Sequence, residues 1–544
     1  MPLRIVHFLA FALIPMGVFL ALFHPGVLDI GNAGWLIRGS DGGENALGLH
    51  AWLHDPAAGM ALRTTLLDSP EGTSLLFTDS NPLVALIVAP FAGILPADAQ
   101  FVGWWLLVCC ILQAVFAWAL LRRFAPGPIA LWCGVALMCA LPTWFNRYVH
   151  ANLFAHWMIL AALWLFISTR RALLPLWWAI LLVAAALVHN YLLLMVAAIW
   201  ASALLEQMIV VPDTRSRLHM SRNAVATMLA VAFVIHLHGV GESFAVTGSY
   251  GAFAMPLDAL WNPANPGYGA IMPAIAQREG RGYEGFQYLG LGLLLLPVVA
   301  IVIARRVAPS GVAEQSLFLR LRWLVPAFIV LLLLAVSNFP DIAGYRLPRV
   351  PLPEALAPVL DTVRASGRLF WPIAYTLVFA AIPIVYRLGA RRAGYGLAAL
   401  LAVQFVDVAA MTQVVRAQSA EADRRRLYVR TVDPRWGPLV ASARDVTFAP
   451  PEAIRDLALF QEIAWRATSL GRPVRLAYTA RVGKVAAARL AGEQRAFEQG
   501  QLDPQRLYIV LPGTPIPGAA RGRLMTLDGV SVLRPIPVNP SSPR

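Results

Sequence analysis

Long apolar stretches alternate with short polar segments over the first three quarters of the chain. Each stretch holds about 20 residues, the length of a helix that crosses the hydrocarbon core of a bilayer. The pattern predicts a polytopic α-helical membrane protein with about eleven spanning helices. We expect these helices at residues 4–23, 101–121, 128–145, 153–169, 174–189, 191–210, 223–241, 287–304, 323–338, 369–386 and 395–412.

The apolar segment at residues 83–97 differs from these stretches, because it is short and Pro90 interrupts it. Such a segment is typical of a helix that lies in the membrane interface rather than across the bilayer. If it were a span, every later arginine group would change sides. We therefore expect an interfacial helix here.

Arginine groups flank the predicted spans, and in this arrangement all of them fall on one side of the membrane. They include Arg122–Arg123, Arg170–Arg171, Arg305–Arg306 and Arg391–Arg392. Because positive residues accumulate in cytoplasmic loops, the N-terminus is expected in the cytoplasm. The segments expected outside are the loops at residues 24–100, 146–152, 242–286 and 339–367 and the C-terminal tail.

The composition agrees with a membrane protein and excludes other classes. Of the 544 residues, 58% are hydrophobic and 14% are charged, which excludes a soluble enzyme. The formal net charge of +14 comes from arginines spread along the chain, so we expect no nucleic-acid partner. Neither a disulfide framework nor a cysteine metal site is expected, because all four cysteines lie inside predicted spans. They are Cys109, Cys110, Cys133 and Cys139.

The tail beyond residue 412 has a different pattern, in which the long apolar stretches end. Predicted helices and strands alternate there, which indicates a small α/β domain. The helices are expected at 452–470 and 484–499, and the strands at 474–480 and 506–511. We therefore divide the chain into a helical membrane domain, residues 1–412, and a periplasmic α/β domain, residues 413–544.

The first outer loop is long and polar, which in a membrane protein is more often functional than connective. Asp41 opens a predicted amphipathic helix in this loop, where it could cap the helix or act as a general base. Asp79 precedes Pro82 and could cap the next helix, or form a two-carboxylate site with Asp41, with or without a divalent cation. His50 and His54 share a helix face at metal-ligand spacing, and a solvated face is the alternative.

Further polar residues map to the outer ends of the predicted spans. Arg364 and Arg368 lie four apart at the outer mouth of the span at 369–386, against the usual sidedness of arginine. A pair of guanidinium groups in this place suits a phosphate. The remaining candidates could line a cavity or could be satisfied groups at helix ends. They are His150, His156, Tyr191, Asn262 and Glu284.

Several short motifs follow one another along the chain in a specific order. They are TDSNPL after the glycine-flanked Asp41, the spacing of His150 to His156–Trp157, HNYLLLMV, LWNP, EGFQYLGLG and RASGRLFWP. Together they resemble a bacterial family of membrane proteins, domain of unknown function 6311, over nearly the whole chain. In the family pattern a Gln-His pair follows the Asp closely, whereas Glu44–Asn45 stands there in this sequence.

That family is similar to the GT-C class of glycosyltransferases, which have a catalytic Asp or Glu in a long first external loop. The resemblance implies a sugar donor linked to polyprenyl phosphate, a cell-envelope glycan or lipid acceptor, and a location in the bacterial inner membrane. It places Asp41 at the catalytic position, and Arg364 and Arg368 at the donor phosphate. A divalent cation could bind at Asp41 and Asp79, and no other cofactor is implied.

The alternative function is a non-catalytic assembly protein or a transporter for lipid-linked glycans. A transporter predicts internal repeats and charges near the bilayer midplane. The sequence shows no clear repeat, and its polar groups gather on one side of the membrane. We therefore expect an enzyme at the outer surface, with membrane lipids around it. The residues expected to bind substrate are Asp79, His150, His156, Tyr191, Asn262, Glu284, Arg364 and Arg368.

Overall fold

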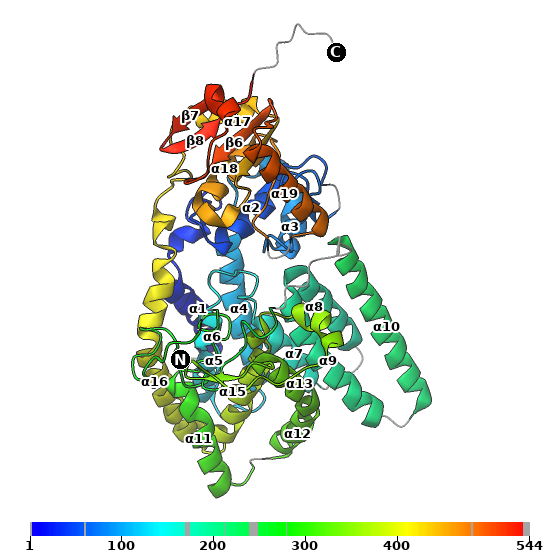
Figure 1. The fold of residues 1–544 in the computed structure, drawn as a ribbon. Helices are drawn as coiled ribbons and strands as arrows, with labels where there is room; N and C mark the ends of the chain where they lie inside the picture. Colours follow the sequence, from blue (N-terminus) through cyan, green and yellow to red (C-terminus); the bar gives the residue numbers. More distant parts are fainter. Residues whose placement is uncertain are drawn as a thin grey trace.

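The computed structural model stacks a small sheet domain on one end of a large helical part (Figure 1). It describes residues 3–58, 61–168, 174–210, 213–238, 249–278, 280–309, 311–479 and 482–536. Arg170 and Arg171, two of the predicted flanking arginines, lie outside the described residues.

The helical part is that of a membrane protein. Its helices are α1 (Leu3–Leu22), α4 (Val102–Leu121), α5 (Pro128–Met138), α6 (Pro142–Phe145), α7 (Trp157–Ile167), α8 (Leu174–Val188), α9 (Asn190–Val210), α10 (Thr214–Leu237), α11 (Leu291–Arg306), α12 (Val312–Leu321), α13 (Val325–Val336), α15 (Trp371–Tyr386) and α16 (Gly389–Ala417). Six helical segments among the described residues are long and apolar enough to cross a membrane, and shorter apolar helices accompany them.

Several predicted spans have different bounds from those expected, among them α16, which covers Gly389–Ala417 instead of 395–412, and two of the differences have a local cause. The helix α10 begins at Thr214, because Asp213 caps it and accepts hydrogen bonds from the amides of Arg215 and Ser216. The arginines expected in a loop before residue 223 therefore lie on its first turns. The span predicted at 128–145 is broken between α5 and α6, since the residue before Pro142 disfavours helical geometry.

The segment predicted to lie in the interface is short and interrupted, as expected. It forms α3 (Pro82–Val88), capped by the Asn81 side chain, and then a 3-10 turn over Ala89–Ile94. Its apolar side chains Ile87 and Ile94 are 59% and 82% exposed. An amphipathic helix with exposed apolar groups suits the membrane interface, where we continue to place it as a prediction.

The C-terminal domain contains a four-stranded sheet with the order β5-β6-β8-β7. The strands β5 and β6 are parallel, and the other pairs are antiparallel. The predicted helices at 452–470 and 484–499 and the strand at 506–511 are all found. The elements of this domain are α17 (Trp436–Ser442), β5 (Asp445–Ala449), α18 (Leu457–Ser469), α19 (Lys484–Glu498), β6 (Arg506–Val510), β7 (Leu524–Leu527) and β8 (Val530–Leu533).

The strand predicted at 474–480 is wrong. Within the described part of this segment, only Val474 makes a β-bridge, to Val446. The hydrogen bonds of the segment are divided between the loop and the sheet. The Val474 amide donates to the Leu66 carbonyl at 2.8 Å and the Ser69 amide donates to the Val474 carbonyl at 3.1 Å, whereas the Arg475 amide donates to the Val446 carbonyl at 2.8 Å. The segment is therefore a link between the two domains.

The first outer loop contains α2 (Asp41–His54), which packs against α18 of the C-terminal domain. The Gln461 amide nitrogen donates to the Ser40 carbonyl at 2.7 Å, and its oxygen accepts from the Gly39 amide at 2.9 Å. His50 stacks on Trp465 with the ring centroids 3.9 Å apart and is 1% exposed, so a solvated histidine face is wrong for this residue. The C-terminal domain therefore fixes the residues directly before Asp41.

A second contact between the domains is ionic. Arg489 on α19 lies 2.8 Å from an Asp68 carboxylate oxygen and 2.7 Å from a Glu71 carboxylate oxygen. All three side chains are largely shielded from solvent. Buried apolar residues of the membrane helices and the sheet domain also form one continuous cluster. The two domains are thus packed as one body around the first outer loop.

The adjacent glycines of α2 give a matched test of this packing. A Cβ atom at Gly43 would lie 2.3 Å from the Gln461 side-chain oxygen, whereas at Gly42 the nearest atom is 3.4 Å away. We expect Gly43→Ala to lower the free energy of unfolding by about 1 to 3 kcal/mol through overpacking. Gly42→Ala is expected to keep or raise it, by up to about 1 kcal/mol, because alanine favours the helix.

The measurement is thermal unfolding of both purified variants in the same detergent. Equal stability of the two variants would show that the contact between α2 and Gln461 does not constrain the domains.

Candidate active site

A cavity of about 550 Å³ lies where the outer loops, the turn between α8 and α9, and the C-terminal domain meet. The loops at 24–100, 146–152, 242–286 and 339–367, which the arginine pattern assigned to one side of the membrane, all contribute to it. It brings together seven of the nine predicted site residues. They are Asp41, Asp79, His150, Tyr191, Glu284, Arg364 and Arg368.

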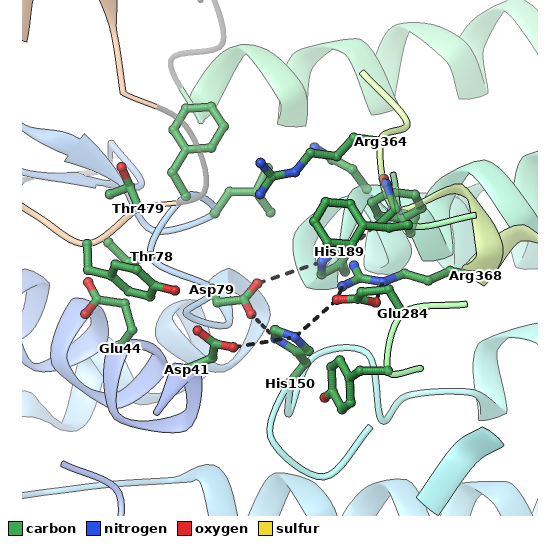
Figure 2. A pocket seen from close by; sticks show the side chains of 18 of the residues that line it. Asp41, Glu44, Thr78, Asp79, His150, His189, Glu284, Arg364, Arg368 and Thr479 are labelled. Carbon is green, nitrogen blue, oxygen red and sulfur yellow. Dashed lines mark hydrogen bonds and ion pairs between the residues drawn. The ribbon is translucent and has the colours of Figure 1, made fainter. Parts of the chain in front are cut away.

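His150 occupies the centre of the charged groups in this cavity (Figure 2). Its Nδ1 atom lies 2.8 Å from Asp79 Oδ2, and its Nε2 atom lies 3.6 Å from both Asp41 Oδ2 and Glu284 Oε1. The Nε2 atom of His189 lies 3.8 Å from the other oxygen of Asp79. One imidazole therefore connects three carboxylates from two different outer loops.

The backbone of Asp79 is held in an unusual conformation. Its φ angle is 57°, which few residues other than Gly, Asn and Asp adopt readily. The side-chain amides of Asn45 and Asn152 both donate to the Asp79 carbonyl, the second at 2.8 Å. The cap of α3 is Asn81, so the alternative that Asp79 caps this helix is wrong. This geometry turns the Asp79 carboxylate towards His150.

Glu284 is surrounded by cations. Arg147, which is fully buried, places Nη1 at 2.8 Å from Glu284 Oε2. Arg368 makes a bidentate contact with the same carboxylate, with its Nε atom 2.7 Å from Oε2. Burial raises the pKa of Glu284, but Arg368, Arg147 and His150 outweigh burial and hold it well below its usual value. Glu284 is therefore an anion that orients three cations.

The charges of His150 and Asp79 depend on each other. Burial lowers the pKa of His150, but the hydrogen bonds and charges of Asp79 and Glu284 outweigh burial and raise it to about 9. Burial raises the pKa of Asp79, but the hydrogen bond and charge of His150 outweigh burial and lower it to about 2. At neutral pH, His150 is an imidazolium ion and Asp79 is a carboxylate.

Asp41 has a different environment from Asp79. It follows Ser40, which holds the cap position of α2, so Asp41 is not the cap. Burial raises the pKa of Asp41, and repulsion from Asp79 and Glu284 adds to burial, whereas His150 and a hydrogen bond with Tyr478 act in the opposite direction. The side chain is 32% exposed and lies in the cavity. Asp41 is thus accessible from the cavity and has a raised pKa.

The two arginines of the predicted phosphate site have different partners. Arg368 is held by Glu284 and is buried. Arg364 lies in the turn between α14 (Ala357–Asp361) and the 3-10 turn Ser366–Phe370, is half-buried, and lies 5.8 Å from the Phe253 ring centroid. Among the described residues, no carboxylate forms an ion pair with Arg364. Arg364 is therefore the arginine available to an anionic ligand.

The structure places His156 and Asn262 outside this cavity. His156 is buried among the helices, where its Nδ1 atom lies 3.0 Å from the hydroxyl of Tyr375. The Asn262 side chain donates to Asp258 and accepts from the amides of Ala264 and Ile275, which shapes the loop before α11. Both side chains make local contacts within the protein, and neither lines the cavity.

The cavity also contains residues that the sequence analysis did not select. They are Glu44, Thr78, Phe253, Tyr283, Tyr478 and Thr479, among others, whereas His189 opens the HNYLLLMV motif at the end of a predicted span. The position of Glu44, one helical turn after Asp41, was a signal that could have found it. Tyr478 had no such signal, because it comes from the C-terminal domain. Arg147 stood in a predicted outer loop, but its ion pair with Glu284 joins positions 137 residues apart.

The donor set does not fit a divalent cation. His150 lies between Asp41 and Asp79, so a positively charged side chain already stands between the two carboxylates. In the parts of the chain that the structure describes, no group of three or more His, Cys, Asp or Glu side chains has an arrangement that could hold a metal ion. This holds for the His50–His54 pair as well. The chemistry proposed below therefore uses no metal ion.

The imidazolium gives a prediction for pH. A pKa raised from 6.5 to about 9 in the folded state means that the stabilisation by His150 is complete below about pH 6.5 and is lost as the pH rises through 9. We expect wild type to lose thermal stability across this range, as measured by melting temperature in detergent. His150→Asn should be less stable than wild type at low pH and should approach it at high pH. Parallel pH profiles for the two proteins would contradict this assignment.

Comparisons with known proteins place the chain in a family. The family described as "Domain of unknown function (DUF6311)" matches residues 12–409, and the "DUF6311 C-terminal domain" matches residues 435–535. No curated protein matches the chain. A solved structure of the archaeal oligosaccharyltransferase AglB from Archaeoglobus fulgidus, in complex with an inhibitory peptide and a dolichol-phosphate, is similar with a TM-score of 0.44 and 11% identity, over 93% of this chain and 69% of that chain. A similarity this distant carries no argument here. The two family matches span most of the chain, and the protein belongs to the DUF6311 family.

Proposed function

We propose that the protein is a membrane glycosyltransferase that moves a sugar from a polyprenyl-phosphate donor to a glycan or lipid acceptor of the cell envelope. The observation that carries the proposal is the pairing, in one cavity, of an accessible carboxylate with a raised pKa and an arginine without a carboxylate partner. The first suits a base and the second suits a phosphate. The motifs resemble the DUF6311 family, and the similarity of that family to the GT-C class supports the same function.

Asp41 is the better candidate base of the two central aspartates. An efficient general base has a pKa near the working pH. The pKa of Asp41 is raised, mainly by burial, whereas His150 holds the pKa of Asp79 at about 2 despite burial. Asp79 is also committed to a 2.8 Å hydrogen bond with His150, while Asp41 lies 3.6 Å from the same ring. Asp41 can therefore accept a proton with less disruption.

The reaction is a single displacement at the anomeric carbon. Asp41 takes the proton of an acceptor hydroxyl as its oxygen forms a bond to that carbon. The bond between the anomeric carbon and the phosphate oxygen breaks, and polyprenyl phosphate leaves with the bonding electrons. Attack from the face opposite the phosphate inverts the configuration. The proton stays on Asp41 until it exchanges with solvent.

Arg364 stabilises the negative charge that develops on the leaving phosphate. Preorganised cations at such a position contribute to catalysis because they favour the transition state over the ground state. Arg368 has a different task, because its guanidinium is bound by Glu284. Through Glu284 it positions His150, and through His150 it positions Asp41. We therefore revise the expected arginine pair to one phosphate ligand and one positioning residue.

Replacement of Asp41 tests its role as the general base. In a strain without the gene, wild type should restore a sugar that is missing from lipopolysaccharide, exopolysaccharide or lipid-linked intermediates. Asp41→Asn, expressed at the same level, should restore less than about one hundredth of it, because loss of a general base costs a factor of about 10² to 10⁴. The measurement is whole-cell glycan analysis by mass spectrometry.

Full restoration by Asp41→Asn would exclude Asp41 as the base. If deletion of the gene left every glycan pool unchanged in a strain without a second copy, the enzymatic function itself would be wrong.

Substitutions at Arg364 and Arg368 distinguish the roles of the two arginines. Arg364→Gln should reduce the same product by about tenfold to a hundredfold, the effect of one charged hydrogen bond, with unchanged protein stability. Arg364→Lys should restore part of it. Arg368→Gln should reduce both product and melting temperature, because it leaves Glu284 with fewer cations. Arg346→Gln, an exposed arginine in the same outer loop, is the matched control and should have no effect. Equal loss for Arg364→Gln and Arg346→Gln would contradict the phosphate role.

A further inference from the structure

Glu44 is a buried carboxyl group without a partner. Its side chain lies on α2, is 2% exposed and lines the cavity. Neither of its carboxyl oxygens has a hydrogen-bond partner in the described structure. Proteins rarely bury a polar group in this way, because the group loses its hydration and gains nothing in exchange. An unpaired group that faces a cavity is therefore a candidate to bind a ligand.

The position of Glu44 relates it to the acceptor rather than to the donor. Residues three apart on a helix are neighbours, with about 5 to 6 Å between their Cβ atoms, so Glu44 lies beside Asp41. Figure 2 shows Glu44 near Asp41 and Thr78, on the side of Asp79 away from Arg368. Tyr478 of the C-terminal domain belongs to the same wall, since it lines the cavity and forms a hydrogen bond with Asp41.

The chemistry of this wall suits hydroxyl groups. Burial, together with the charges of Asp41 and Asp79, raises the pKa of Glu44 well above its usual value, which favours the neutral form of the group. A neutral carboxyl group donates one hydrogen bond and accepts others, as a sugar hydroxyl does. Burial, followed by the charges of the same carboxylates, also raises the pKa of Tyr478 to about 12, so its hydroxyl remains protonated.

We propose that Glu44 binds a second hydroxyl of the acceptor, next to the hydroxyl that Asp41 deprotonates, and that the acceptor is therefore a sugar with vicinal hydroxyls. This inference rests on the proposed glycosyltransferase function. An acceptor with one isolated hydroxyl, such as a serine side chain or a simple lipid alcohol, would leave Glu44 unpaired. A vicinal diol gives Asp41 and Glu44 one hydroxyl each.

The test uses the deletion strain with wild type, Glu44→Gln, Glu44→Leu and Asp41→Asn expressed at equal levels. The readouts are the amount of the restored sugar and methylation linkage analysis of the residue that carries it. Glutamine keeps one donor and one acceptor in the shape of a neutral glutamic acid, whereas leucine removes both. Melting temperatures of the purified variants separate binding from folding, and Glu44→Met replaces Glu44→Leu if the latter does not accumulate.

We expect Glu44→Gln to retain at least about half of the product, and Glu44→Leu to lose about tenfold or more, the effect of one hydrogen bond to substrate. The melting temperature of Glu44→Leu should not fall, because the carboxyl group it removes has no partner in the protein. Linkage analysis should show the new bond on a sugar with a free hydroxyl at the adjacent carbon.

Three results would overturn the inference: full product from Glu44→Leu, equal loss from Glu44→Gln and Glu44→Leu, or a product linked to a protein side chain or an isolated hydroxyl. In each case the Asp41→Asn strain shows whether the proposed function also fails. If Asp41→Asn makes no product, the glycosyltransferase stands and only the role of Glu44 is wrong. If Asp41→Asn makes full product, the general-base assignment falls as well.

Discussion

The cavity depends on the contacts of one imidazolium ion with three carboxylates. Asp41, Asp79 and Glu284 could not stay ionised together in a half-buried site without compensation, because like charges in a poorly hydrated place raise each other's free energy. His150 lies between all three, and Arg147 and Arg368 balance Glu284 from the other side. The same contacts join the first outer loop, the loop before α7 and the loop before α11. The same ion pairs therefore balance the charges of the cavity and hold the loops together.

His150 does not contact the carboxylates equally, and this difference gives the residues different roles. His150 holds Asp79 closely and Asp41 loosely, so that one carboxylate stabilises the imidazolium and the other remains able to bind a proton. Arg368 is used within the protein, whereas Arg364 is not. Two residues of the same type, close in sequence, therefore differ in function because only one of them has an internal partner.

The helical framework was predictable from sequence, because hydropathy reports directly on the bilayer. The sidedness of the loops stays a prediction from arginine position. The four loops predicted on one side meet at one cavity, which seven of the nine predicted site residues line. The other features of the site could not be predicted, because they depend on contacts between positions that are far apart in the sequence. The partner of Arg368 is 84 residues away, and Val474 bonds to Leu66 and Ser69 of the first loop in addition to its bridge to the sheet. His156 and Asn262 are polar residues near span ends, like the true cavity residues, and only their packing separates the two groups.

The contact between Gln461 and the residues before Asp41 has a consequence for the synthesis of the protein. The two sides of the Gln461–Ser40 hydrogen bond are 421 positions apart. At ordinary rates of translation, roughly 20 to 80 seconds pass between their emergence from the ribosome. During that interval the membrane helices can insert, but the segment before Asp41 lacks the support that orients it. The first outer loop thus reaches its final arrangement only after the sheet domain has been synthesised and has docked against α2.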